Sequence, residues 1–297
     1  MYPYRNAYNR KRVDALVARS RDSSSIRVIE ICVEGKDDVD FYERWITSIK
    51  NLISSKIVIL VKEIKNIVGS YPNIDNTVGN CDLVVQIAQV DKDKNRLFIR
   101  DRDLLEDKDL VCANNLFYTD YPAIESYAFT EESFNAFNKY VYSGDYKDID
   151  IRYKYSLHFL FSMYFLRLSN KGNNDTVKFE VAQLRKKYES YFQDGYFRIG
   201  DFYQNNDPNI KSSVDDVLNK LNKKEIDARK YIYSHDTEHI LNFLFAMDKE
   251  FLKFMKAPPA KGRYIINWML KRFIDEGLWK QEPMFQGIIN RYILSES

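Results

Sequence analysis

Apolar residues in the first 130 positions fall into short runs separated by stretches with helical spacing. Runs rich in Val, Ile and Phe and bounded by turn residues predict strands, which span 28–33, 56–64, 96–100 and 115–118. Helical spacing predicts helices over 37–49, over 80–90 and in a segment after Pro122. Strands that alternate with helices in this way predict βαβ units and a mostly parallel sheet.

Beyond Thr130 the pattern changes to helical spacing, with Gly or Pro at several of the joints. The helix-periodic segments span 131–142, 150–168, 176–193, 212–233, 236–256 and 262–276. No run in this half of the sequence reads as a convincing strand. The fold class is therefore predicted as α/β, with a mostly parallel sheet flanked by helices and followed by a mainly α-helical region.

Three segments are expected from these patterns. Residues 1–25 form a basic N-terminal segment, which suits a solvated tail, the reading we favour, or docking on a partner or a nucleic-acid backbone. Residues 26–130 form the α/β domain. Residues 131–297 form the mainly helical region, to which dimerisation, partner binding or substrate binding can be assigned.

Composition narrows the class of protein. A chain of 297 residues that is 45% apolar can bury a sizeable core. Lys and Arg number 45 against 43 Asp and Glu, so no overall field favours nucleic acid or membrane, although a local basic groove remains compatible. The three cysteines, Cys32, Cys81 and Cys112, lack metal-ligand spacing and suit a reducing cytosol. Without a leader or a membrane-length apolar stretch, we expect a soluble cytoplasmic protein.

Acidic residues follow three of the predicted strands. Glu34 comes directly after the first strand, and Gly35 behind it is expected to permit a tight turn into the next helix. Asp101 and Asp103 follow the third strand, and Asp120 follows the fourth. Because functional groups in open α/β sheets gather beyond the carboxyl ends of strands, these carboxylates are expected to converge.

The predicted carboxylate cluster has the chemistry of a metal site. Asp101 and Asp103 would point the same way on an extended backbone, so both can bind one cation, with Glu34 as a third ligand. Mg²⁺ prefers such oxygen ligands, and a cation relieves the repulsion between clustered carboxylates. Asp120 is a further candidate ligand, but turn formation and capping with Thr119 would also explain it.

Two more residues near the expected site have an open role. Glu125, one turn into the helix after Pro122, would face the site as a ligand or base, or simply belong to that helix. Lys36 would orient a phosphate or stabilise an oxyanion, and a solvated lysine at a helix start explains it nearly as well.

The histidines offer a second candidate site. His235 and His239 lie one helical turn apart, a spacing that can chelate a metal, but no third ligand is evident nearby. We favour instead a helix start capped by Ser234 or Asp236. A weaker possibility is that His235 acts as a general acid at the carboxylate site. His158 sits in an aromatic run and is most simply a core or interface residue.

Basic and aromatic residues interleave at several positions that could bind nucleic acid, because cations track phosphates and rings stack on unpaired bases. The basic candidates are Arg100, Arg102, Lys261, Arg263, Lys271 and Arg272, and the aromatic ones are Tyr264 and Trp268. The alternative, which we prefer, is that Trp268 and its apolar neighbours Ile265, Met269 and Phe273 form the buried face of a helix.

The two acidic motifs together resemble the Toprim domain, which topoisomerases, bacterial primases, overcoming-lysogenization-defect (OLD) nucleases and small rRNA-maturing ribonucleases share. The first motif is Glu34-Gly35-Lys36-Asp37-Asp38 and the second is Asp101-Arg102-Asp103. The resemblance implies that Glu34 acts in acid–base chemistry or metal binding and that the aspartate pair binds Mg²⁺ or Mn²⁺. It covers about the first 130 residues, with 26–130 as the Toprim-like catalytic domain.

The sequence segments VEGKDD…FY, IRDRD and YTDYPAIESY resemble those of the Toprim effector nucleases of PARIS anti-phage systems. This resemblance implies a nuclease that an ABC-type ATPase sensor holds inactive, and that is released to form a homodimer and cut host tRNA in abortive infection. Water or the RNA 2′-hydroxyl would be the nucleophile. The alternatives are an OLD-type DNA nickase or nuclease, and a non-catalytic regulatory partner of the ATPase.

Overall fold

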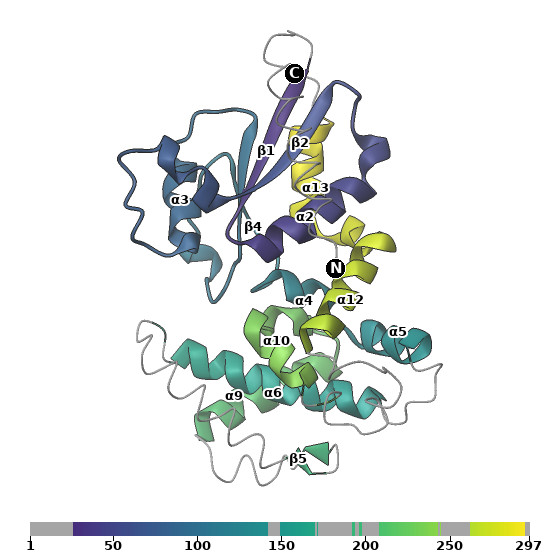
Figure 1. The fold of residues 1–297 in the computed structure, drawn as a ribbon. Helices are drawn as coiled ribbons and strands as arrows, with labels where there is room; N and C mark the ends of the chain where they lie inside the picture. Colours follow the sequence, from purple (N-terminus) through teal and green to yellow (C-terminus); the bar gives the residue numbers. More distant parts are fainter. Residues whose placement is uncertain are drawn as a thin grey trace. The chain divides into compact units, whose positions relative to one another are not determined.

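The computed structural model describes residues 26–141, 149–169, 171, 192–193, 196–197, 208–242, 244 and 262–294 (Figure 1). The basic segment 1–25 lies outside these residues. The chain divides into two compact units. Unit 1 comprises Met1–Arg100, Val111–Tyr118 and Gly277–Ser297, and unit 2 comprises Asp101–Leu110 and Thr119–Glu276. The units are thus discontinuous in sequence, and the contiguous division at residue 130 stays a prediction.

Unit 1 contains the predicted parallel sheet. Its strands are β1 (Arg27–Val33), β2 (Ile57–Glu63), β3 (Arg96–Arg100) and β4 (Leu116–Tyr118). They lie in the order β2-β1-β3-β4, and every neighbouring pair is parallel. Glu30 of β1 is in register with Arg96 of β3, and Cys32 with Phe98. The α/β class and the parallel sheet are confirmed.

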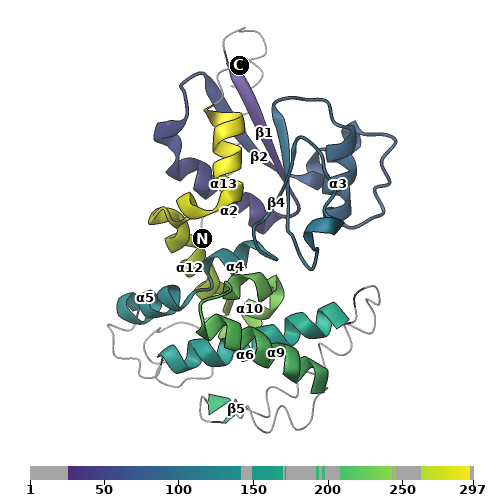
Figure 2. The same ribbon diagram turned by 180° about the vertical axis from the view of Figure 1, so that it is seen from behind.

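Helices cover both faces of this sheet (Figures 1 and 2). The described α-helices of unit 1 are α2 (Lys36–Ser48), α3 (Asn80–Val90) and α13 (Pro283–Ile288). Its 3₁₀ turns are η1 (Lys50–Leu52), η2 (Ile64–Asn66), η3 (Val68–Ser70) and η7 (Leu278–Gln281), and η8 (Ile289–Ile293) is a π-helical turn. Helix α3 buries Leu83, Val84 and Ile87 against Cys32 and Phe98 of the sheet. Helices α2 and α13 lie on the other face.

The last described segment, 277–294, completes the core of unit 1. Phe285 of α13 is fully buried, and its ring centroid lies 5.0 Å from that of Trp45 in α2. Trp279 lies 6.1 Å from the same indole, and Tyr292 lies 6.0 Å from Phe117 of β4. Such edge-to-face pairs add to the free energy gained by burying large rings. The sequence had indicated no role for this segment in the α/β domain.

Unit 2 is mainly helical, as predicted. Its described α-helices are α4 (Ile124–Ala128), α5 (Glu131–Val141), α6 (Ile149–Ser169), α9 (Pro208–Asn222), α10 (Ser234–Leu241) and α12 (Gly262–Asp275). Its described 3₁₀ turns are η4 (Asp107–Asp109) and η5 (Ala228–Tyr231). Helix α12 begins in close contact with α10, because a Cβ atom at Gly262 would lie 1.9 Å from the carbonyl oxygen of Glu238. Only glycine fits at this position.

Two predictions for the helical half are wrong in part. The helix expected over 212–233 ends at Asn222, because Lys224 adopts a left-handed φ of 60° that interrupts it. Strands β5 (Phe192–Gln193) and β6 (Tyr196–Phe197) form a short antiparallel pair, where only helix was expected. Two-residue strands are too short to leave a periodic signal. Most of the helix predicted over 176–193 lies outside the described residues. Among the helices described, none is long and apolar enough to cross a membrane.

Candidate functional site

Glu34 stands at the carboxyl end of β1, directly after Val33, where the sequence placed it. The residue is half-buried, and its carbonyl oxygen accepts a 2.8 Å hydrogen bond from Nδ2 of Asn80. Asn80 is the first residue of α3. The start of that helix therefore fixes the direction in which the chain leaves the strand, a role for Asn80 that the sequence did not suggest.

The turn from β1 into α2 differs from the prediction. Gly35 is the N-cap residue with φ −141° and ψ 175°, an extended conformation open to any residue. Its N–H donates a 2.9 Å hydrogen bond to Oδ2 of Asp38, which completes a capping arrangement. The expectation that this turn depends on the freedom of glycine is wrong. Lys36 is exposed at the first position of α2.

In unit 2, Asp101 and Asp103 belong to a loop tied to a second loop. The N–H of Arg102 donates to Oγ1 of Thr119 at 2.8 Å, and the N–H of Asp103 donates to the carbonyl of Pro122 at 2.9 Å. Asp103 has a left-handed φ of 52°, so the expected extended backbone through both aspartates is wrong. Local backbone conformation at a loop follows from these contacts between distant residues, which a short motif does not encode.

The carboxylates of Asp101 and Asp103 nevertheless lie near the same side chain, the phenol of Tyr233. Burial raises the pKa of Tyr233 well above its usual value, and the negative charge of Asp103 and a hydrogen bond to its side chain raise it further. The negative charge of Asp101 also raises the pKa of Tyr233, whereas the positive charge of Arg167 lowers it. The structure thus gives Asp103 a hydrogen-bonding partner in Tyr233, which sequence reasoning missed, and the charge of Asp101 also acts on that phenol.

Asp120 is held by Tyr127. The Tyr127 hydroxyl accepts a 2.8 Å hydrogen bond from the Asp120 N–H and donates one of 2.9 Å to its Oδ2. Thr119 is buried, and its hydroxyl donates to the carbonyl oxygen of Tyr121 at 2.6 Å. These bonds match the turn-forming alternative for Thr119 and Asp120. Metal binding by Asp120 stays a prediction, as does a site role for Glu125, which lies half-buried in the first turn of α4.

His235 and His239 both lie in helix α10. His235 lies in the first turn of α10, and its side chain is outside the described part of the structure. The N-cap of α10 is Tyr233, so the prediction of Ser234 or Asp236 there is wrong. Asp236 is instead fully buried and binds the guanidinium of Arg167. The ring of His239 stacks on Phe159 with centroids 5.9 Å apart.

His158 fits the predicted core or interface role. Its side chain is half-buried within α6, and burial lowers the pKa of the imidazole.

The helix that carries Trp268 fits the packing alternative. Ile265, Met269 and Phe273 are buried, and Trp268 packs edge to face on Phe137 at 5.4 Å. Tyr264 is exposed, as a stacking residue would need to be.

The predicted phosphate-binding cations differ in their surroundings. Arg272 pairs with Glu132 and Glu276, and Arg102 pairs with Asp107. Arg100, at the end of β3, has a buried Nε for which no residue in the described ranges accepts a hydrogen bond. Lys261 lies outside those ranges. The guanidinium of Arg100 therefore has a donor that an anionic group could use.

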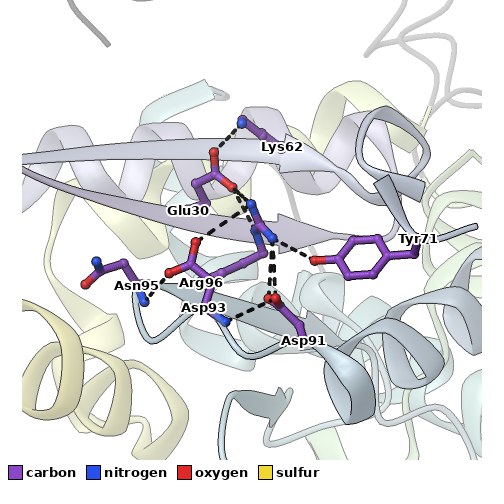
Figure 3. Close-up of polar contacts among 7 residues, drawn as sticks. All are labelled: Glu30, Lys62, Tyr71, Asp91, Asp93, Asn95 and Arg96. Carbon is purple, nitrogen blue, oxygen red and sulfur yellow. Dashed lines mark hydrogen bonds and ion pairs between the residues drawn. The ribbon is translucent and has the colours of Figure 1, made fainter. Parts of the chain in front are cut away.

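A second polar cluster in unit 1 was not predicted (Figure 3). It consists of Glu30, Lys62, Tyr71, Asp91, Asp93, Asn95 and Arg96. Glu30 accepts hydrogen bonds from Lys62 and from Nε of Arg96, the latter at 2.7 Å. Burial would raise the pKa of Glu30, but these two bonds and the two positive charges outweigh it and lower the pKa. The signal available in the sequence was one acidic residue inside an otherwise apolar strand.

Each cation of this cluster is paired with at least one carboxylate, which indicates a structural role. Arg96 also donates to the Tyr71 hydroxyl at 2.7 Å and contacts Asp91 at 3.5 Å. A surface pocket of about 810 Å³ adjoins it, lined in part by Asp91, Lys94, Asn115 and Arg291. Residues 91–95 and 115 precede β3 and β4, so this pocket lies at the amino ends of those strands, whereas Glu34 lies at a carboxyl end.

The chemistry of Asp101 and Asp103 fits a divalent metal. Mg²⁺ usually binds through one or two carboxylates and completes its shell with water and substrate phosphate. Within the ranges that the structure describes, no group of three or more His, Cys, Asp or Glu side chains is placed to hold a metal ion. Comparison with protein-family models and with curated proteins finds no match to this sequence.

Proposed function

We propose that the protein is a metal-dependent Toprim endoribonuclease, the effector of an ATPase-coupled anti-phage system, which cleaves host tRNA to stop translation. One observation carries the proposal: in the loop that follows β3, the Asp103 carboxylate bonds to the Tyr233 hydroxyl, and the charge of Asp101 acts on the same phenol. Strand β3 pairs in parallel with β1, and β1 is followed by Glu34. Sites in open α/β folds form beyond such strand ends.

The resemblance assigns the binding of Mg²⁺ or Mn²⁺ to Asp101 and Asp103, and metal binding or acid–base chemistry to Glu34. When bound, the cation activates the attacking oxygen and neutralises charge on the scissile phosphate. Arg100 and Lys36 supply positive charge for the phosphate, and the start of α2 adds the favourable end of a helix dipole. The nucleophile is water or the RNA 2′-hydroxyl.

The biological assignment rests on the resemblance of the motifs. The resemblance also implies the ABC-type ATPase partner, the active homodimer and the tRNA substrate. The net charge of +2 provides no overall field that favours nucleic acid. Local cations beside the carboxylates therefore have to provide the attraction to RNA.

The test is cleavage by the purified full chain of separate tRNA and plasmid DNA pools with Mg²⁺. We expect tRNA to be cut, chelation to stop the reaction, and Glu34→Gln and Asp103→Asn to slow it by about 100-fold or more. Asp107→Asn is the matched control, because this carboxylate lies in the same loop with 91% of its side chain exposed. It should retain the parental rate.

Other outcomes assign other functions. Cleavage of DNA alone would favour an OLD-type nuclease. A protein that cuts neither pool, and whose Asp101→Asn and Asp103→Asn variants still protect cells from phage, would be a non-catalytic regulator of the ATPase. Full nuclease activity and toxicity in Glu34→Ala would overturn the proposed role of that residue.

A further inference from the structure

Four side chains of unit 2 form a continuous chain of contacts that ends at Asp103. Asp236, which is fully buried, accepts hydrogen bonds of 3.1 and 3.0 Å from Nε and Nη2 of Arg167. The guanidinium carbon of Arg167 lies 4.5 Å from the ring centroid of Tyr233. The Tyr233 hydroxyl in turn donates to the Asp103 carboxylate. The contacts thus run from a buried ion pair to a candidate metal ligand.

The anchor end of this chain is rigid. A bidentate Arg–carboxylate pair fixes the plane of the guanidinium, and the buried carboxylate leaves it little freedom. Stacking of that guanidinium on the ring then fixes the orientation of Tyr233. Arg167 comes from α6, and Tyr233 and Asp236 come from the start of α10. Two helices therefore set the direction of one hydroxyl.

Asp103, at the other end of this chain of contacts, needs to be held by its surroundings. Asp103 has a φ of 52°, a conformation that non-glycine residues adopt at a cost and keep only when their surroundings hold them. Its N–H is bound by the carbonyl of Pro122, and its carboxylate by Tyr233. The backbone bond fixes where Asp103 sits, and the phenol fixes where its carboxylate points. A carboxylate has about four lone-pair positions, so it can accept this bond and still bind a cation.

We propose that Tyr233 is a positioning residue that orients the Asp103 carboxylate for a divalent metal ion. The inference deepens the proposed function and rests on it. Groups that hydrogen-bond to metal ligands fix the orientation of those ligands, and their loss lowers metal affinity. Neither sequence distance nor motif connects the two residues, which are 130 positions apart, and only the fold brings them together.

The test uses Tyr233→Phe, which removes the hydroxyl and keeps the ring that packs on Arg167. We expect Mn²⁺ binding by the purified full chain, measured by calorimetry or electron paramagnetic resonance, to weaken by about 10- to 100-fold. The Mg²⁺ concentration needed for half-maximal cleavage should rise by a similar factor, with an unchanged melting temperature. Tyr231→Phe is the control, because it removes the hydroxyl of a neighbouring tyrosine whose ring packs on Phe161 and Tyr164.

A double-mutant cycle separates orientation from general damage to the fold. If Tyr233 acts through Asp103, Tyr233→Phe should change Mn²⁺ affinity far less in an Asp103→Asn background than in the parent. Equal effects in both backgrounds, or parental affinity in Tyr233→Phe, would overturn the inference while the nuclease proposal stands. Failure of the parent to bind Mn²⁺ and to cleave RNA would instead overturn the proposed function itself.

Discussion

Nδ2 of Asn80 donates a 2.8 Å hydrogen bond to the carbonyl oxygen of Glu34. This bond links the first residue of α3 to the first residue beyond β1. It ties the helix that covers one sheet face to the strand end that carries the candidate catalytic carboxylate. Asn80 is therefore expected to matter for activity more than for stability.

Asn80→Ala should lower the free energy of unfolding by about 1 kcal/mol, the usual contribution of one hydrogen bond. Cleavage should fall by a larger factor than that loss of stability explains, because the Glu34 backbone is no longer held. Urea unfolding and tRNA cleavage measure the two effects. Asn76→Ala, at an exposed position of the preceding loop, is the control. Parental cleavage by Asn80→Ala would show that the bond does not position Glu34.

Gly35→Ala is expected to fold with a stability within about 0.5 kcal/mol of the parent. The backbone there is extended, and an added Cβ would lie 3.6 Å from Oδ2 of Asp38, an ordinary contact distance. If phosphate approaches the chain at Gly35, the added methyl group will slow cleavage without unfolding the protein. Thermal melting and tRNA cleavage, measured together, distinguish this from a structural need for glycine.

Gly262→Ala, unlike Gly35→Ala, is expected to lower the stability of the protein. The added Cβ would overlap the Glu238 carbonyl oxygen at 1.9 Å, so α10 and α12 have to move apart. Overpacking of this kind usually costs about 1 to 3 kcal/mol, or more where backbone is displaced. A Gly262→Ala protein as stable as the parent would contradict the close packing of these helices.

Local periodicity was sufficient to predict the α/β unit. Helix α3 and strand β3 have the bounds expected from the sequence, because each buries a continuous apolar face. The role of residues 277–294 could not be predicted in the same way. Phe285 contacts Trp45 across 240 positions, and such long-range packing leaves no mark in the local pattern.

The acidic motif predicted which residues of the candidate site to examine, but not how they are held. Asp101 and Asp103 were identified from their place after a strand, and the structure brings both near Tyr233. Tyr233 and Arg167 are ordinary helix-associated residues in the sequence, and no spacing rule connects them with the aspartates. The left-handed backbone of Asp103 likewise depends on contacts with a second loop.

The Arg167–Asp236 pair is expected to stabilise unit 2 strongly. Arg167→Leu would leave the fully buried Asp236 carboxylate without its cation, which typically costs about 3 to 5 kcal/mol. Urea unfolding followed by far-UV circular dichroism measures this loss. The double variant Arg167→Leu, Asp236→Leu should recover part of it, since no buried charge then remains. A single variant that unfolds like the parent would show that the carboxylate finds another way to be neutralised.

The stability contributed by Glu30 should depend on pH in a predictable direction. Its pKa is lowered below the ordinary value of 4.5, because hydrogen bonds and charge from Lys62 and Arg96 outweigh the effect of burial. The ionised form is therefore favoured by folding, and the resulting stability is present above pH 4.5 and is lost as the pH falls toward the lowered pKa.

Glu30→Gln tests this by removing the titration while it keeps the shape of the side chain. The difference in free energy of unfolding between parent and variant should be largest near neutral pH and shrink steadily below pH 4.5. Urea unfolding midpoints at four or more pH values, about 3 to 7, give the curve. A difference that stays constant, or that grows in acid, would show that Arg96 and Lys62 do not hold Glu30 in its ionised form.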